Sequence, residues 1–197
     1  MLSLKEARSY KEDLIKLKQE GYGTVYIGRF YNISQQYVTK ILQENNIDLT
    51  RKIIKVNRQY FRKIDTPNKA YILGFMYGDG NVRKNLHSWE IGLRYDDLEI
   101  LEKIKEEIEY EGTIKYVLKH PHVLTNSQPQ YMLKVYCKEM CKDLVKCGCM
   151  PQKTWLLRFP YFLNEPLIRH FVRGYWDSDG HINKQYPSCT IVGNSFM

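Results

Sequence analysis

The stretch that decides the fold is AYILGFMYGDG, residues 70–80, and a related stretch, HFVRGYWDSDG, occupies residues 170–180. When the two are aligned, Gly74 matches Gly174, Gly78 matches Ser178, and an Asp-Gly pair closes each stretch. Both are apolar segments with helical spacing, and both end at glycine, a residue common at helix C-termini. The repeated pattern predicts two equivalent helices.

Small residues four positions apart share one face of a helix, as Gly74 and Gly78 do in the first stretch. Such a face lets two helix backbones approach closely. If the two helices pack through these faces, their C-terminal ends converge, and Asp79 and Asp179 lie at those ends. Two carboxylates there repel each other and the helix dipoles, a conflict that a divalent cation relieves. The alternative is a pair of core helices followed by ordinary Asp-Gly turns.

The stretches ILGFMYGDG, residues 72–80, and VRGYWDSDG, residues 172–180, resemble the two motifs of the LAGLIDADG homing endonucleases of the intein and phage type. The resemblance implies that the motif helices form the interface between pseudo-symmetric halves. It also implies that the penultimate acid of each motif binds the catalytic metals, Mg²⁺ or Mn²⁺. On this chain the implied catalytic metal ligands are Asp79 and Asp179, with Gly78 and Ser178 beside them in the metal site.

Two further features of the chain bear on this resemblance. The sixth motif position is often acidic in the family, and here it is Tyr77 in the first motif and Asp177 in the second. The run MPQKT at residues 150–154, followed by Phe159-Pro160, resembles the stretch between the repeats. It implies a supporting catalytic role for Lys153, which could organise water or offset charge on a phosphate. The alternative for Lys153 is an exposed loop lysine.

The composition favours a polyanionic partner. The 197 residues include 30 Lys and Arg against 22 Asp and Glu, which gives a formal net charge of +8 and a pI near 9.1. Nucleic acid is the commonest partner of such a protein, and double-stranded DNA is the partner expected here. No apolar run reaches the roughly 18 residues of a membrane span, and the N-terminus has no signal-peptide core. We therefore expect an intracellular, cytoplasmic protein without a membrane or small-molecule partner.

The five cysteines are an odd number, and nothing indicates secretion, so disulfides are not expected. Four of them, Cys137, Cys141, Cys147 and Cys149, could hold zinc, but their spacing is not one of the usual paired arrangements. We expect reduced and mostly buried thiols instead.

Residues 1–48 are predicted to form a small helix-turn-helix module. A helix over Leu4–Glu20 precedes Thr24–Tyr31, and Ser34 is a good N-cap for the helix that follows. The resemblance to helix-turn-helix domains implies that the N-terminal part of this last helix reads DNA. The alternative is a three-helix structural or protein-binding module. The side chains expected to point toward DNA are Gln35, Gln36, Thr39 and Lys40.

Residues 49–66 have no clear period and are rich in Lys and Arg, including Arg51 and Lys52. We expect a basic linker or arm that follows DNA phosphates. The alternative is a solvated charged linker without a DNA contact.

Residues 67–165 alternate in pattern between one helix and two strands, which gives helix, two strands, helix, two strands, helix. This order predicts an α+β fold with an antiparallel sheet covered on one face. It matches the αββαββα repeat of the LAGLIDADG family. A basic open face can lie in a DNA major groove. The side chains expected there are Arg83, Lys84, Arg94, Lys115 and Lys134.

Residues 166–197 are interpreted as the start of a second repeat, which is incomplete because only seventeen residues follow Gly180. They suffice for one hairpin, so the chain is either a fragment or a shortened descendant. The expected function is a site-specific, metal-dependent DNA endonuclease that makes a staggered double-strand break. The alternative is a non-cleaving DNA-binding regulator, and a protein-interaction domain fits the charge poorly. The oligomeric state stays open.

Overall fold

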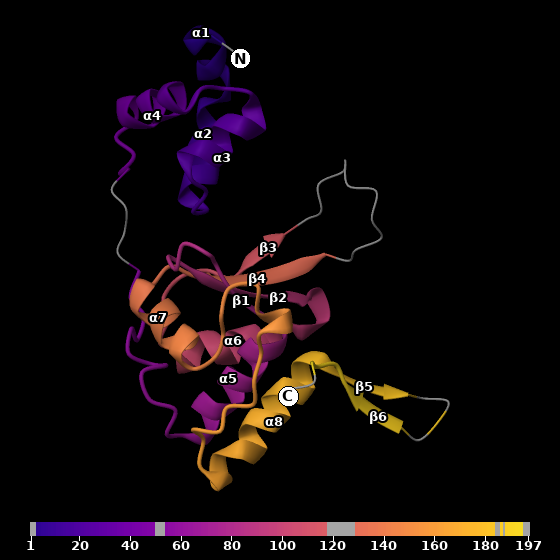
Figure 1. Ribbon diagram of the computed structural model, residues 1–197. Coiled ribbons are helices and arrows are strands. Elements are labelled where there is room, and N and C mark those ends of the chain that lie inside the picture. The colour runs from indigo at the N-terminus through magenta and orange to yellow at the C-terminus, as the bar shows by residue number, and fades with distance from the viewer. Residues whose placement is uncertain (1–2, 50–53, 118–128, 184–185, 187, 195–197) are drawn as a thin grey trace. The chain divides into compact units, whose positions relative to one another are not determined.

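The structure is a computed structural model that describes residues 3–49, 54–117, 129–183, 186 and 188–194 (Figure 1). The chain divides into two compact units, Met1–Ile53 and Ile54–Met197. The fold is mixed α+β, with helices, a four-stranded antiparallel sheet and a separate two-stranded hairpin. No helix in the described part of the chain is both long and apolar enough to cross a bilayer.

The first unit consists of helices. They are α1 (Leu4–Ala7), a 3₁₀ turn (Arg8–Tyr10), α2 (Lys11–Gln19), α3 (Thr24–Tyr31) and α4 (Gln35–Glu44). The single helix expected over Leu4–Glu20 is therefore interrupted at residues 8–10. The Ser9 hydroxyl donates to the Glu6 carbonyl at 2.6 Å, a bond of the kind that competes with regular helix pairing.

A tight turn joins α3 to α4. Asn32 ends α3 in the left-handed conformation, with φ of 54°, which asparagine tolerates better than most residues. Ser34 then caps α4 by accepting a hydrogen bond from the Tyr37 backbone N–H at 3.2 Å. Gly28 permits the close crossing, because an added Cβ would lie 2.6 Å from the Ile33 carbonyl oxygen. The core of this unit consists of buried apolar residues, namely Ala7, Leu14, Ile27, Ile33, Val38, Ile41 and Leu42.

The second unit begins its regular structure with α5 (Pro67–Gly78), followed later by α6 (Leu98–Glu107), α7 (Lys138–Lys146) and α8 (Glu165–Asp179). Thr66 caps α5 by accepting a hydrogen bond from the Lys69 N–H, and Pro67 occupies the first helical position, where its missing N–H costs nothing. Nearly every residue from Ala70 to Tyr77 is buried. A helix that is apolar on all sides belongs in a core, and α5 is the central helix of this unit.

The sheet contains β1 (Gly80–Val82), β2 (Trp89–Arg94), β3 (Lys115–Val117) and β4 (Gln130–Val135), in the order β1-β2-β4-β3. One face is apolar and packs into the core with α5, α6 and α7. The inward residues of this face are Val82, Trp89, Ile91, Leu93, Leu133 and Val135. The element order from α5 to α7 confirms the predicted α+β arrangement with an antiparallel sheet covered on one face.

Residues 49–66 were expected to form a basic linker, but the described residues from 54 onward pack as part of the second unit. Tyr60 and Phe61 are buried in the core, and the Asn57 N–H donates to the Ile108 carbonyl at 2.9 Å. The segment is held by these contacts rather than by a regular element, so it shows no period in the sequence. Arg51 and Lys52 lie outside the described residues.

After α8 the chain forms a hairpin of β5 (Gly180–Asn183) and β6 (Ser188–Ile191). Its register repeats that of β1 and β2: Gly80 pairs with Ile91, and Gly180 pairs with Ile191. The second stretch therefore repeats the helix-to-hairpin geometry of the first. The burial differs, because Val82 is 2% exposed and its counterpart Ile182 is 62% exposed.

Candidate active site at the paired helix ends

Helices α5 and α8 pack through their glycines. A Cβ added at Gly74 would clash with the Phe171 carbonyl oxygen and lie 2.8 Å from the Tyr175 nitrogen. In reverse, a Cβ added at Gly174 would clash with the Tyr71 carbonyl oxygen. The contacts are reciprocal between equivalent positions, so the helices are related by an approximate two-fold axis. This is the close packing that the small-residue spacing predicts.

The C-terminal ends of the two helices converge. Asp79 directly follows α5, and Asp179 is the last residue of α8. A Cβ added at Gly78 would clash with the Ser178 side chain and lie 3.1 Å from Cγ of Asp179. The Ser178 hydroxyl donates to the Tyr175 carbonyl at 2.9 Å, which keeps it within its own helix. The structure thus brings together the four positions that the family resemblance assigns to a metal site.

The two carboxylates affect each other electrostatically. Burial raises the pKa of Asp79 to about 6, and the neighbouring Asp179 charge adds to the rise. Burial likewise raises the pKa of Asp179, while Lys153 opposes the rise in both acids. Asp79 keeps part of its surface open to solvent, so a ligand can reach it. Two nearby carboxylates with raised pKa values form a site that gains stability from a bound cation.

Lys153 completes the cluster. It lies in a 3₁₀ turn (Lys153–Trp155) that follows Gln152, which has a left-handed backbone conformation with φ of 58°. Its ammonium group donates to the Gly78 carbonyl at 2.7 Å and to the Gly80 carbonyl. Burial lowers the pKa of Lys153, while the Cys149 thiol and both carboxylates oppose that change. The side chain is therefore anchored on both sides of Asp79.

Replacing Lys153 by methionine is expected to raise the pKa of Asp79 further above its usual range, because a nearby positive charge favours the ionised carboxylate. The pKa can be measured in metal-free protein by following the Asp79 carboxyl carbon by NMR as pH changes. Lys115→Met is the control, since Lys115 lies on the open face of the sheet and should leave this pKa unchanged. An unchanged or lower pKa in Lys153→Met would contradict the electrostatic coupling.

The sixth motif positions do not join the carboxylate pair. The Tyr77 side chain is buried, and its hydroxyl donates to the Cys147 carbonyl at 2.6 Å. Asp177 instead accepts a hydrogen bond from the Tyr71 hydroxyl at 2.9 Å and lies 3.8 Å from Arg173 Nε. Tyr77 therefore packs in the core, and Asp177 links α8 to α5 through its hydrogen bond with Tyr71.

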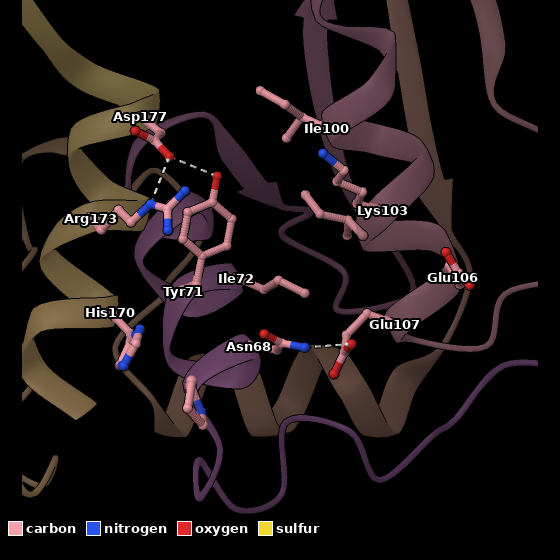
Figure 2. A pocket seen from close by; sticks show the side chains of 12 residues that line it. Asn68, Tyr71, Ile72, Ile100, Lys103, Glu106, Glu107, His170, Arg173 and Asp177 are labelled. Carbon is pink, nitrogen blue, oxygen red and sulfur yellow. Dashed lines mark hydrogen bonds and ion pairs between the residues drawn. The ribbon is translucent and has the colours of Figure 1, made fainter. Parts of the chain in front are cut away.

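Asp177 also lines a cleft of about 690 Å³ between α5, α6 and α8. Figure 2 shows Tyr71, Arg173 and Asp177 grouped on one side of this cleft, with Asn68 and Glu107 joined by a hydrogen bond. Its charged lining residues are two cations, Lys103 and Arg173, and three anions, Glu106, Glu107 and Asp177. The residues that line it do not include Asp79, Asp179 or Lys153, and it is separate from the candidate active site.

The donor atoms at the helix ends suit Mg²⁺ or Mn²⁺. Mg²⁺ prefers oxygen ligands and is usually held by one or two carboxylates together with substrate phosphates, and Asp79 and Asp179 supply two carboxylates. Within the described ranges, no group of three or more His, Cys, Asp and Glu side chains gathers around a possible metal position. At the four cysteines considered for zinc, burial raises the pKa of each thiol, so the thiolate form that zinc needs is disfavoured.

The open face of the sheet carries the predicted basic residues in register. Lys134 pairs with Glu90, and Lys115 pairs with Met132 across from Gly92. Arg94 lies at the end of β2 and forms an ion pair with Asp96 at 3.2 Å. Arg83 and Lys84 follow β1 in the hairpin turn and are exposed. All five predicted residues therefore lie on the open face or at the hairpin tip.

In the first unit, Gln35, Gln36 and Lys40 are exposed on α4, and Thr39 is half-buried. The Gln35 amide donates to the Thr24 hydroxyl at 3.3 Å, which links the start of α4 to the start of α3. The predicted residues thus share one outward surface near the N-terminus of α4.

Two residues of the open face of the sheet, Glu90 and Tyr136, were not among the candidate site residues predicted from the sequence. Glu90 lies between Asn81 and Lys134 in register, and its carboxylate accepts a hydrogen bond from Asn81 at 3.1 Å. Tyr136 follows β4 two positions after Lys134, and 61% of its surface is exposed. The alternation of β4 was the signal that could have placed Tyr136 on the open face.

The chain is similar to a distant relative among known proteins. No family model matches the chain. The chain is similar to a protein of Methanocaldococcus jannaschii that carries the name uncharacterized protein MJ0314, with 28% identity over 155 residues. The match covers 74% of this chain and 54% of that protein, so the chain spans about half the length of the relative.

Proposed function

We propose that the chain is a metal-dependent DNA endonuclease of the LAGLIDADG homing type, which cuts both strands of a long, specific site. One observation carries the proposal. Helices α5 and α8 pack closely through Gly74 and Gly174 and bring Asp79 and Asp179 together at their C-terminal ends. Lys153 binds backbone carbonyls on both sides of Asp79. The αββαββα order of the second unit supports the same family.

In this proposal the two carboxylates hold Mg²⁺ or Mn²⁺ against a phosphodiester of the DNA. The bound metal supplies activation of the attacking water and stabilisation of the leaving oxygen. Lys153 offsets negative charge beside Asp79, and the close packing of α5 against α8 at their glycines keeps the acids at a fixed separation. Phosphoryl transfer needs mainly positioning and positive charge from the protein, which suits a site built from three charged side chains.

The two units would divide the recognition of the DNA. The open face of the sheet presents Arg94, Lys115 and Lys134 to a major groove, which admits β-ribbons. The two helices and the tight turn between α3 and α4 support a helix-turn-helix, in which α4 would present Gln35 and Gln36, side chains that can pair with adenine. Phosphate contacts would position the protein, and these base contacts would specify the sequence.

A non-cleaving DNA-binding regulator is the second candidate. The hairpin β5–β6 favours it, because every described residue of β6 is exposed and the second motif has no covered sheet within the described ranges. A regulator needs the basic surfaces and no catalytic carboxylate pair.

The test begins by selecting bound duplexes from a randomised DNA library, since the target is unidentified. The selected site, cloned in a supercoiled plasmid, is incubated with the full chain and Mg²⁺, with Mn²⁺, and with EDTA as the metal-free control. Linear product with either metal and none with EDTA supports the endonuclease. Salt-sensitive binding without nicked or linear product supports the regulator. Absence of both binding and cleavage rejects the two proposals.

A further inference from the structure

A second cleft of about 690 Å³ lies beside the tip of the β1–β2 hairpin. It is bounded by the hairpin turn, by the end of β4 and by the residues just before Lys153. The candidate active site does not use it. The lining residues that matter here are Arg83, Lys84, Asn85, Lys134, Tyr136 and Gln152.

The carboxylate of Glu90 forms ion pairs with two of the cations that line this cleft. Glu90 has a side chain that is 9% exposed, and it forms ion pairs with Arg83 at 2.6 Å and Lys134 at 3.0 Å. Burial raises the pKa of Glu90, but the contacts with Lys134 and Arg83 and the hydrogen bond from Asn81 outweigh burial, and the pKa lies below its usual value. Glu90 therefore stays ionised at neutral pH and fixes both cations.

The ion pairs with Glu90 leave part of the Arg83 and Lys134 side chains exposed, so both can still contact a ligand. The Arg83 side chain is 50% exposed, and a guanidinium group has five N–H donors, of which Glu90 occupies only some. Lys84 is exposed in the same turn. With Arg83, Lys84 and Lys134 against Glu90, the cleft retains positive charge. It therefore suits an anion such as a phosphate group.

The cleft also has an aromatic wall. Tyr136 is 61% exposed, and the Lys134 ammonium lies 5.5 Å from the centre of its ring. An exposed aromatic ring beside cations is the arrangement by which proteins hold unstacked nucleotides, because every base has a π-face and every phosphate a charge. Neither feature alone indicates a nucleotide, but the two line one cleft.

We propose that this cleft binds one nucleotide of the DNA strand, with its base stacked on Tyr136 and its phosphate on Arg83 and Lys84. The location favours a strand of DNA over a free nucleotide. The cleft continues the open face of the sheet, and Gln152, which lines it, precedes Lys153 of the candidate active site. The proposal rests on DNA binding by this face and not on cleavage. The nucleotide has to leave the base stack, as occurs where proteins kink or open a duplex.

The experiment uses the full chain without divalent metal and duplexes of the selected site, each with 2-aminopurine at one successive position. Binding is expected to change the fluorescence strongly at one position, because the base leaves the duplex stack and meets the tyrosine ring. Tyr136→Ala should abolish that change and weaken binding roughly 10-fold, since base–aromatic stacking contributes on this scale. Tyr136→Phe, which keeps the ring, should preserve both.

Two controls separate stacking from charge and folding. Tyr161→Ala removes a tyrosine that is 86% exposed and does not line the cleft, and it should leave binding unchanged. Lys84→Gln should weaken binding and lower the slope of log affinity against log salt by about 1, whereas Tyr136→Ala should leave that slope unchanged.

The outcomes distinguish this proposal from the proposed function. Unchanged fluorescence and affinity in Tyr136→Ala, with DNA binding intact, would overturn the nucleotide cleft and leave the endonuclease standing. A position-specific signal, together with no cleavage of the selected plasmid site in the separate assays with Mg²⁺ and Mn²⁺, would support the cleft and reject the endonuclease. Calorimetric titration with free deoxynucleoside monophosphates should show no binding, and tight binding lost in Tyr136→Ala would make the cleft a small-molecule site instead. Absence of any DNA binding rejects both proposals.

Discussion

Replacing Asp79 by asparagine is expected to reduce the rate of DNA cleavage by at least about 1,000-fold, which corresponds to about 4 kcal/mol of transition-state stabilisation. In the proposed site Asp79 is one of the two carboxylates at the converging helix ends that would hold the metal. An amide has neither the charge nor the affinity of a carboxylate for Mg²⁺. Asp179→Asn should have an effect of the same order, because the two positions are equivalent under the approximate two-fold axis.

The affinity for DNA should change little in both variants, because the sheet and α4 supply the expected DNA contacts. Asp79→Asn should also raise the melting temperature of the metal-free protein, since it removes a charge that burial and Asp179 make unfavourable. The addition of Mg²⁺ should then stabilise the natural protein more than the variant.

Single-turnover cleavage of the selected plasmid site measures the cleavage rate, and gel shifts without metal measure the affinity for DNA. Asp177→Asn is the matched control, because Asp177 lies two residues from Asp179 on α8 but bonds to Tyr71 instead. It should cleave within a few-fold of the natural protein. Full cleavage by Asp79→Asn, or an equal loss in Asp177→Asn, would show that the carboxylate pair is not the active site.

Replacing Gly74 by alanine is expected to destabilise the second unit by about 3 kcal/mol, the upper part of the range for overpacked cores. The added methyl group would meet the Phe171 carbonyl oxygen and the Tyr175 nitrogen. Both atoms belong to the backbone of α8, so no side-chain rotation can relieve the clash. The helices would have to separate or shift, which would also move Asp79 relative to Asp179.

Thermal unfolding of the full chain measures the effect, and a decrease of about 10 °C in the melting temperature of the second unit is expected at this size. Gly92→Ala is the control. Gly92 lies on the open face of β2, where an added Cβ would be 3.7 Å from the nearest atom, the Gln130 side-chain oxygen, in ordinary contact. That variant should unfold near the natural temperature, and an equally stable Gly74→Ala protein would contradict the close packing of α5 against α8.

Local sequence patterns predicted helices and strands well where a regular spacing of residue types identified the packed face of the element. The spacing of Gly74 and Gly78 indicated a helix that packs through small residues, and the order of helices and strands over residues 67–165 indicated an antiparallel sheet covered on one face. Ser34 marked the cap before α4. These signals are readable because each arises from neighbours within about two turns or a few residues along a strand.

Segments whose structure depends on distant partners could not be predicted in this way. Tyr60 and Phe61 looked like part of a basic linker, and their burial follows from contacts with the core that no local period records. Tyr77 looked like a departure from an acidic motif position, and its role became evident only from its bond to the Cys147 carbonyl. The interruption of the first helix at Arg8–Tyr10 was also not predicted, since its pattern remains amphipathic.

By itself the sequence determined that two small-residue helices end in Asp-Gly pairs, that a basic antiparallel sheet follows the first, and that Lys153 belongs to the stretch between them. Only the tertiary structure decided that Lys153 binds the carbonyls of Gly78 and Gly80, that the two acids share one site, and that Glu90 holds Arg83 and Lys134 beside Tyr136. The physical reason is that spacing along a chain sets which face of an element a side chain occupies. Distances between side chains far apart in sequence depend instead on how closely the elements pack, and here that packing is set by glycines that leave no room between two backbones.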